Sequence, residues 1–179
     1  MDRNTEITLD HLHDAIVAAT TAQFPDLATV EFYREDRKGL PMPACLLELT
    51  DMEAAPDFDP GTDQLAVLAT FEAQLVIGFR QPGKSAKREI RKLAGAFAAW
   101  VRLQRWGCPV GPAQVVGAFP DDFEPELDQF ECWRVEWQQI IHLGETVWTN
   151  DGTTPTAVFV SQVPLVGAAH ADEYDQVTA

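Results

Sequence analysis

The segment between Leu65 and Arg105 constrains the fold more strongly than any other part of the chain. Apolar and polar side chains alternate from Leu65 to Phe79, which predicts a long β-strand, although the alanine-rich start also fits a helix. Gln81-Pro82-Gly83 interrupts this pattern. We expect Ser85 then to cap a long helix that ends at Gly107. The apolar stripe of this helix is Ile90, Leu93, Ala94, Phe97 and Val101.

Other segments predict the remaining elements of the fold. A second strongly alternating run, Phe130–Leu143, predicts another long strand. Near the N-terminus, a helical stripe capped by Thr8 or Asp10 ends before Pro25. Shorter apolar runs predict strands, and the segments rich in proline, glycine and acids between them predict loops. The predicted strands lie at 26–34, 44–50, 113–119 and 156–163, and the loops at 34–43, 51–62 and 120–129.

This order of elements predicts an α+β fold. Consecutive alternating strands favour a mixed or antiparallel sheet with the N-terminal helix and the long central helix packed on one face, rather than a doubly wound parallel sheet. At 179 residues and 46% hydrophobic, the chain is long and apolar enough for one domain, which we place at residues 1–149. Residues 150–179 form a C-terminal extension that we expect to fray or to dock onto a neighbouring molecule.

Bulk composition excludes several classes of protein. No apolar run is long enough to predict a membrane span, and the polar, acidic start is unlike a secretory signal. Cys45, Cys108 and Cys132 form no C-x-x-C pair, which predicts free thiols in a reducing compartment. The net charge of −15 argues against general affinity for nucleic acid.

Basic residues are concentrated in the predicted central helix. Eight of the 13 Lys and Arg residues lie between Arg80 and Arg105, so this window carries +7 and the remainder −22. Four of the cations recur at i, i+3, i+4 and i+7, which places them on one helix face. A solvated face is the simplest interpretation, but acidic loops at 51–63 and 121–128 favour an interface with another copy or an acidic partner. The residues of this predicted interface are Lys84, Lys87, Arg88, Arg91, Lys92, Asp121, Asp122 and Glu124.

The start of the same helix also matches a phosphate-binding loop. Gly78-x-x-x-x-Gly83-Lys84-Ser85 has the spacing at which backbone N–H groups surround phosphates and the serine hydroxyl binds magnesium. Against this, the preceding strand alternates, whereas a phosphate-loop strand is buried on both faces of a parallel sheet. Nucleotide binding is therefore the alternative hypothesis, and a glycine-rich turn with a serine cap is the simpler one.

No pattern predicts catalysis, a cofactor or a metal. Asp57-x-Asp59-x-Gly61-x-Asp63 resembles a calcium loop only faintly, because Leu68 replaces the bidentate glutamate. His11 and His13 would point to different sides of a helix and cannot share a metal. Neither G-x-S-x-G nor H-E-x-x-H occurs, and we expect a protein that is not an enzyme.

The order of elements, together with the run W-R-V-E-W-Q-Q-I-I-H-L-G-E-T-V-W from Trp133 to Trp148, resembles the tail terminator (tail completion) proteins of tailed bacteriophages. The resemblance covers roughly residues 8–148. It implies a non-enzymatic virion protein that forms a ring, usually a hexamer, which caps the tail tube and provides the head-joining surface. The implied partners are further copies of the chain, the tail tube protein and the head–tail connector protein, and the implied location is the virion tail, assembled in the host cytoplasm. DNA would pass through the ring without sequence-specific binding. Another phage neck or connector protein is the related alternative, and the extension past Thr149 would reach an adjacent subunit or the connector.

Overall fold

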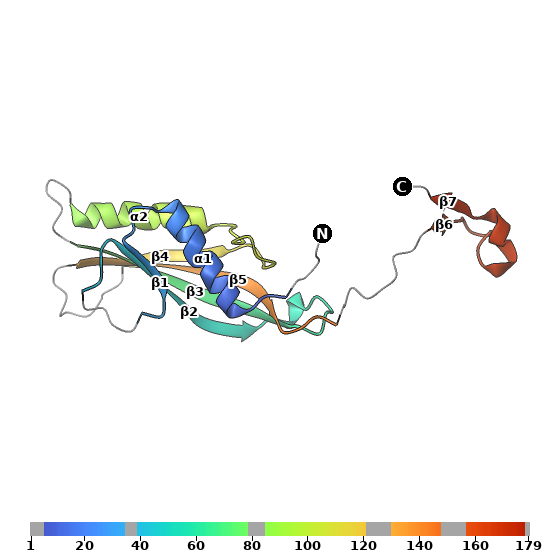
Figure 1. Ribbon diagram of the computed structural model, residues 1–179, viewed down its shortest axis with the longest axis horizontal. Helices are drawn as coiled ribbons and strands as arrows, with labels where there is room; N and C mark the ends of the chain where they lie inside the picture. The colour runs from blue at the N-terminus through green and yellow to red at the C-terminus, as the bar shows by residue number, and fades with distance from the viewer. Residues whose placement is uncertain (1–5, 35–38, 79–84, 121–129, 148–156, 178–179) are drawn as a thin grey trace. The chain divides into compact units, whose positions relative to one another are not determined.

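A computed structural model describes residues 6–34, 39–78, 85–120, 130–147 and 157–177 (Figure 1). The chain divides into two compact units, Met1–Val147 and Trp148–Ala179, and each is described by itself. The first unit holds the main sheet and both α-helices. The second holds a small two-stranded sheet.

The first unit is an α+β structure with a five-stranded mixed sheet, as the sequence predicts. The strand order is β1-β2-β3-β5-β4, and only the pairing of β1 with β2 is parallel. The chain leaves β3, passes through a helix and returns as β4, while β5 lies between β3 and β4. The strands are β1 (Thr29–Phe32), β2 (Ala44–Ala54), β3 (Leu65–Gly78), β4 (Gln114–Pro120) and β5 (Phe130–Leu143).

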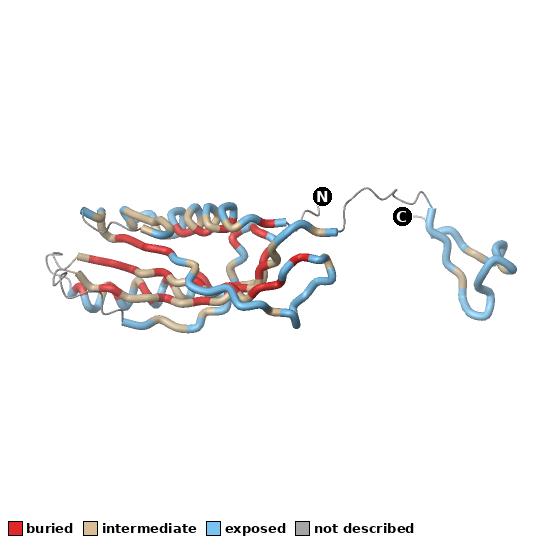
Figure 2. Tube along the Cα trace, turned by 90° about the horizontal axis from the view of Figure 1, so that it is seen from below, coloured by how far each residue is buried: buried red, intermediate tan, exposed pale blue. Residues whose placement is uncertain are grey.

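The two long alternating segments form the centre of the sheet. β3 and β5 pair over fourteen residues each, from Leu65 opposite Leu143 to Gly78 opposite Phe130. Figure 2 shows buried positions alternating with partly exposed ones along these strands. Phe71 and Trp137 lie directly opposite each other, are fully buried and stack with ring centroids 5.4 Å apart. Successive side chains of a strand point to opposite faces of the sheet. The alternating sequence therefore produces one face that the helices cover, the covered face, and one that they leave uncovered, the open face.

Both helices pack on the covered face, as predicted. α1 (Leu9–Gln23) crosses over the strands and α2 (Ala86–Val101) runs alongside them (Figure 1). Thr8, rather than Asp10, is the N-cap of α1, and its hydroxyl accepts a hydrogen bond of 3.2 Å from the His11 backbone N–H. The two helices share one buried core with the covered face of β3. Their fully buried apolar side chains are Leu12, Ile16, Ile90, Ala94, Phe97 and Val101.

The predicted end of the central helix at Gly107 is wrong, because α2 ends at Val101. Leu103 has a φ of 68°, which no helix accommodates. The buried side chain of Gln139, on β5, holds the segment that follows the helix. Its amide donates to the carbonyls of Gln104 (3.1 Å) and Gly111 (2.6 Å) and accepts from Trp106 Nε1 (2.9 Å). These long-range hydrogen bonds turn the chain away from the helix axis.

The predicted loop at 51–62 is also partly wrong. β2 continues to Ala54 through an irregularity between Leu49 and Asp51, and the residues after it pair with Val67–Thr70 of β3. A bulge of this kind lets a strand continue despite a local mismatch. A short 3₁₀ helix, η1 (Pro56–Phe58), follows.

The second unit contains β6 (Val158–Val160), a 3₁₀ segment η3 (Ala168–Glu173) and β7 (Asp175–Val177). β6 and β7 pair antiparallel. The strand predicted at 156–163 is therefore present but shorter. The sequence does not predict β7, because three residues are too few to display an alternating pattern.

We expect Gln139→Ala to destabilise the first unit by about 2–4 kcal/mol, because it leaves one buried donor and two carbonyls without their partner. Urea unfolding followed by tryptophan fluorescence measures the change. The control is Gln138→Ala on the open face, where the side chain makes one weak bond of 3.3 Å to Thr70. Equal effects of the two substitutions would contradict the role assigned to Gln139.

Candidate interaction surfaces

Three of the four cations predicted to share one helix face, Lys87, Arg88 and Arg91, lie together on α2, and Lys92 lies beside them. Lys87, Arg88, Arg91 and Lys92 are exposed and surround one shallow surface hollow with Ser85. We call these four residues the basic face. The buried stripe of α2 points into the core, and the helical period therefore directs the basic face outward. Lys84 lies outside the described residues.

Two members of the basic face have partners within the chain. Lys92 pairs with Glu89 at 2.8 Å, and the Arg91 guanidinium lies 5.2 Å from the centre of the Trp133 ring. The side chains of Lys87 and Arg88 make no ion pair with any residue that the structure describes. Both lie in the first turn of α2, where positive charge opposes the helix dipole. Lys87 and Arg88 are therefore unfavourably placed in the isolated subunit.

The acidic partner surface predicted for this face is only partly described. Asp121, Asp122 and Glu124 lie outside the described residues. In the predicted loop at 51–63, Asp51 and Glu53 lie on β2 rather than in a loop. Their register places them on the open face of the sheet, opposite Thr70 and Leu68 of β3.

The open face carries an acidic row that no local sequence pattern predicts. Glu48, Glu72 and Glu136 occupy directly opposed positions on β2, β3 and β5. Like charges at such positions repel each other. With Asp51 and Glu53 they form what we call the acidic face. Each glutamate stands at a polar position of an alternating strand, but the strand register is needed to bring the three together.

One cation offsets this acidic face within the described residues. Arg134 Nη1 lies 3.5 Å from Glu72 Oε1, and the guanidinium lies 6.0 Å from the centre of the Phe119 ring. Glu48, at the β2 end of the row, is exposed. The acidic face and the basic face lie on opposite sides of the sheet, because α2 packs on the covered face and the acids occupy the open one.

The phosphate-loop motif falls largely outside the described residues, which omit 79–84. Gly78 ends β3 and Ser85 precedes α2, so the expected order of strand and helix is present. However, β3 runs antiparallel to both of its neighbours, β2 and β5. The Ser85 side chain makes no capping hydrogen bond.

His13 and the three cysteines pack against neighbouring residues. His13 stacks on Phe32 with ring centroids 4.1 Å apart, and its partial burial lowers its pKa. All three cysteines are free, as predicted, and buried, and complete burial raises the pKa of the Cys45 thiol. Among the described residues, no group of three or more His, Cys, Asp or Glu side chains is placed to hold a metal ion. No helix in this part of the chain is long and apolar enough to cross a membrane.

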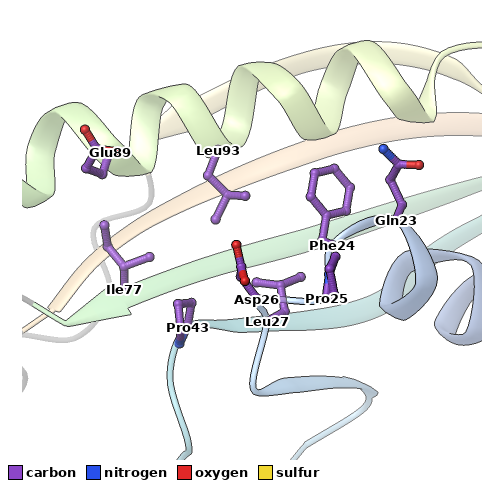
Figure 3. A pocket seen from close by; sticks show the side chains of 9 residues that line it. All are labelled: Gln23, Phe24, Pro25, Asp26, Leu27, Pro43, Ile77, Glu89 and Leu93. Atoms are coloured by element: carbon purple, nitrogen blue, oxygen red, sulfur yellow. The ribbon is translucent and has the colours of Figure 1, made fainter.

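A surface groove of about 310 Å³ lies between the end of α1, the helix α2 and the adjoining ends of β2 and β3 (Figure 3). Its walls are both apolar, with Phe24, Leu27, Ile77 and Leu93, and polar, with Gln23, Asp26 and Glu89. Four segments that are far apart in the sequence build this groove, and no single motif predicts it.

No protein-family model matches this chain, and a comparison with curated proteins finds no match.

We expect Glu136→Gln to stabilise the isolated subunit by roughly 0.2–1 kcal/mol, because it removes one charge from a row of opposed carboxylates. The gain should shrink as salt is raised from about 0.01 M to 1 M, since the Debye length falls tenfold. Urea unfolding at low protein concentration measures both effects. Asp57→Asn on η1, outside the row, serves as the control, and an equal gain there would contradict repulsion within the row.

Proposed function

We propose that this chain is a structural, non-enzymatic protein of a bacteriophage tail, and that its copies form a ring that ends the tail tube and provides a surface for joining the head. The observation that carries the proposal is the pair of oppositely charged faces on opposite sides of one sheet. Basic Lys87 and Arg88 on one subunit would meet the acidic face of the next. The resemblance of the Trp133–Trp148 run to tail terminator proteins agrees with this geometry.

Two different patches on opposite sides of a subunit favour head-to-tail contacts. A twofold dimer uses the same patch on both partners, whereas a head-to-tail contact joins two different patches and generates a ring when the rotation closes. Each closing contact would bring Lys87 and Arg88, which make no ion pair within the described residues, beside the acidic face of the next subunit. The first-turn cations of α2 and the opposed carboxylates of the open face are unfavourable in the isolated subunit. Between subunits they would attract each other.

The remaining partners follow from the same proposal. The tail tube protein would contact one rim of the ring and the head–tail connector protein the other. DNA would pass through the ring without being held, since a chain of net charge −15 repels the phosphate backbone. The ring would be a component of the virion tail, assembled in the host cytoplasm. A related neck or connector protein would use the same two faces.

Nucleotide binding at Gly78–Ser85 is the second candidate. The literal motif between a strand and a helix favours it. The antiparallel neighbours of β3 disfavour it, because phosphate loops follow strands of parallel sheets. The two candidates assign Lys84 different tasks, a magnesium-dependent nucleotide contact in one and an interface cation in the other.

A charge exchange tests the head-to-tail contact. We expect Arg88→Glu alone and Glu48→Arg alone each to weaken subunit association about tenfold or more, because each places like charges at the contact. The chain that carries both substitutions should recover association, since each contact again joins opposite charges. Sedimentation velocity over a concentration series measures the assembly.

Arg102→Glu is the matched control, because Arg102 is exposed but lies beyond the end of α2. Association weakened equally by Arg102→Glu would indicate a general charge effect. Failure of the double variant to recover, with its fold intact by circular dichroism, would show that these two faces do not meet.

A further inference from the structure

The groove between the end of α1, the helix α2 and the sheet belongs to neither charged face, and the proposed ring does not use it. Its volume of about 310 Å³ lies at the lower end of the range typical of small-molecule pockets. Such pockets combine apolar walls with a few polar groups that orient the ligand. The lining of this groove has the same two components.

The apolar walls of the groove are held in place by the rest of the subunit. The Phe24 ring stacks on Phe97 with ring centroids 5.5 Å apart and meets Trp100 edge-on at 5.3 Å. A hydrogen bond of 3.0 Å from the Leu27 N–H to the Phe24 carbonyl closes the turn after α1. Ile77 is a buried residue of β3. Because these walls are already ordered, a ligand would lose little affinity to ordering them.

The polar part of the lining determines which kind of ligand fits. Gln23, Asp26 and Glu89 line the same groove as the apolar side chains. A purely apolar occupant would cover these groups without replacing their hydrogen bonds to water, which is unfavourable. A favourable occupant therefore carries hydrogen-bond donors as well as an apolar surface.

The two carboxylates of the groove differ in their partners. Glu89 pairs with Lys92 at 2.8 Å. Asp26 makes no ion pair with any residue that the structure describes. Figure 3 shows the Asp26 side chain pointing from its loop toward α2, beside the apolar side chains of the groove. The groove therefore holds one carboxylate whose charge the described residues leave unpaired, next to apolar walls.

We propose that this groove binds a small organic cation, with an ammonium group beside Asp26 and a compact apolar body against Leu27, Ile77 and Leu93. An ammonium group has three donors and no acceptor, so the Asp26 carboxylate and the Gln23 side-chain carbonyl are suitable partners for it. No residue of the basic face lines the groove. The inference goes beyond the proposed ring and does not depend on it.

Ligand-observed NMR on the full chain, with two probes of similar shape, tests the proposal. Cyclohexylammonium and cyclohexanol share an apolar ring, but only the first is charged near neutral pH. We expect saturable binding of cyclohexylammonium, about fivefold tighter than that of cyclohexanol, which is the size expected for one partly exposed ion pair. Cyclohexanecarboxylate should bind more weakly than either, because Asp26 repels it.

Asp26→Asn separates the ion pair from general contact with the apolar walls. We expect it to weaken the binding of cyclohexylammonium about fivefold and to change that of cyclohexanol by less than about twofold, since the two ligands differ only in the charged head. Asp57→Asn is the matched control, because Asp57 is exposed on η1 and does not line the groove. It removes the same charge and should leave both affinities unchanged.

Three results would overturn the proposal. They are no saturable binding of cyclohexylammonium, equal affinities for cyclohexylammonium and cyclohexanol, and equal effects of Asp26→Asn and Asp57→Asn in variants that circular dichroism shows to be folded. Native mass of the same samples records the oligomer independently. A closed ring that does not bind the cation would retain the proposed function and remove this site, whereas binding without a ring would do the reverse.

Discussion

The pairing of β3 with β5 is the interaction on which the rest of the structure depends. Fourteen residues of each strand are in register, and the stacked Phe71 and Trp137 rings mark the centre of the face that the helices cover. A slip of one residue would move every side chain to the other face. The register therefore decides at once where the core forms, which side α1 and α2 occupy, and which glutamates align on the open face.

The same constraint creates the two charged faces. α2 buries its apolar stripe against the covered face, so its cations lie on its exposed side, with Arg91 reaching over Trp133 of β5. The acids of β2, β3 and β5 gather on the other side of the sheet. Both faces carry charge that the described part of the subunit compensates only in part, through Lys92 with Glu89 and Arg134 with Glu72. In a head-to-tail ring, the charges that repel one another on each face would instead attract the opposite charges of the neighbouring subunit.

Local patterns in the sequence predict the elements but not their long-range adjustments. The period of two in Phe130–Leu143, the cap at Thr8 and the apolar stripe of α2 are local signals, and the structure confirms them. The end of α2 depends on the buried amide of Gln139, thirty-three residues beyond Trp106, and the extension of β2 depends on pairing with β3. Helical spacing likewise predicts the basic face. The acidic face, in contrast, depends on strand register, and the groove depends on four distant segments that meet in space.

The central claim is that copies of this chain form a closed ring without nucleotide. Native mass spectrometry of the purified full chain, with and without magnesium and ATP, tests it most directly. The account predicts a discrete closed oligomer, with a hexamer as the expected size, whose mass ATP does not change. A monomer that gains the mass of one nucleotide would contradict the account and would assign Gly78–Ser85 to phosphate binding.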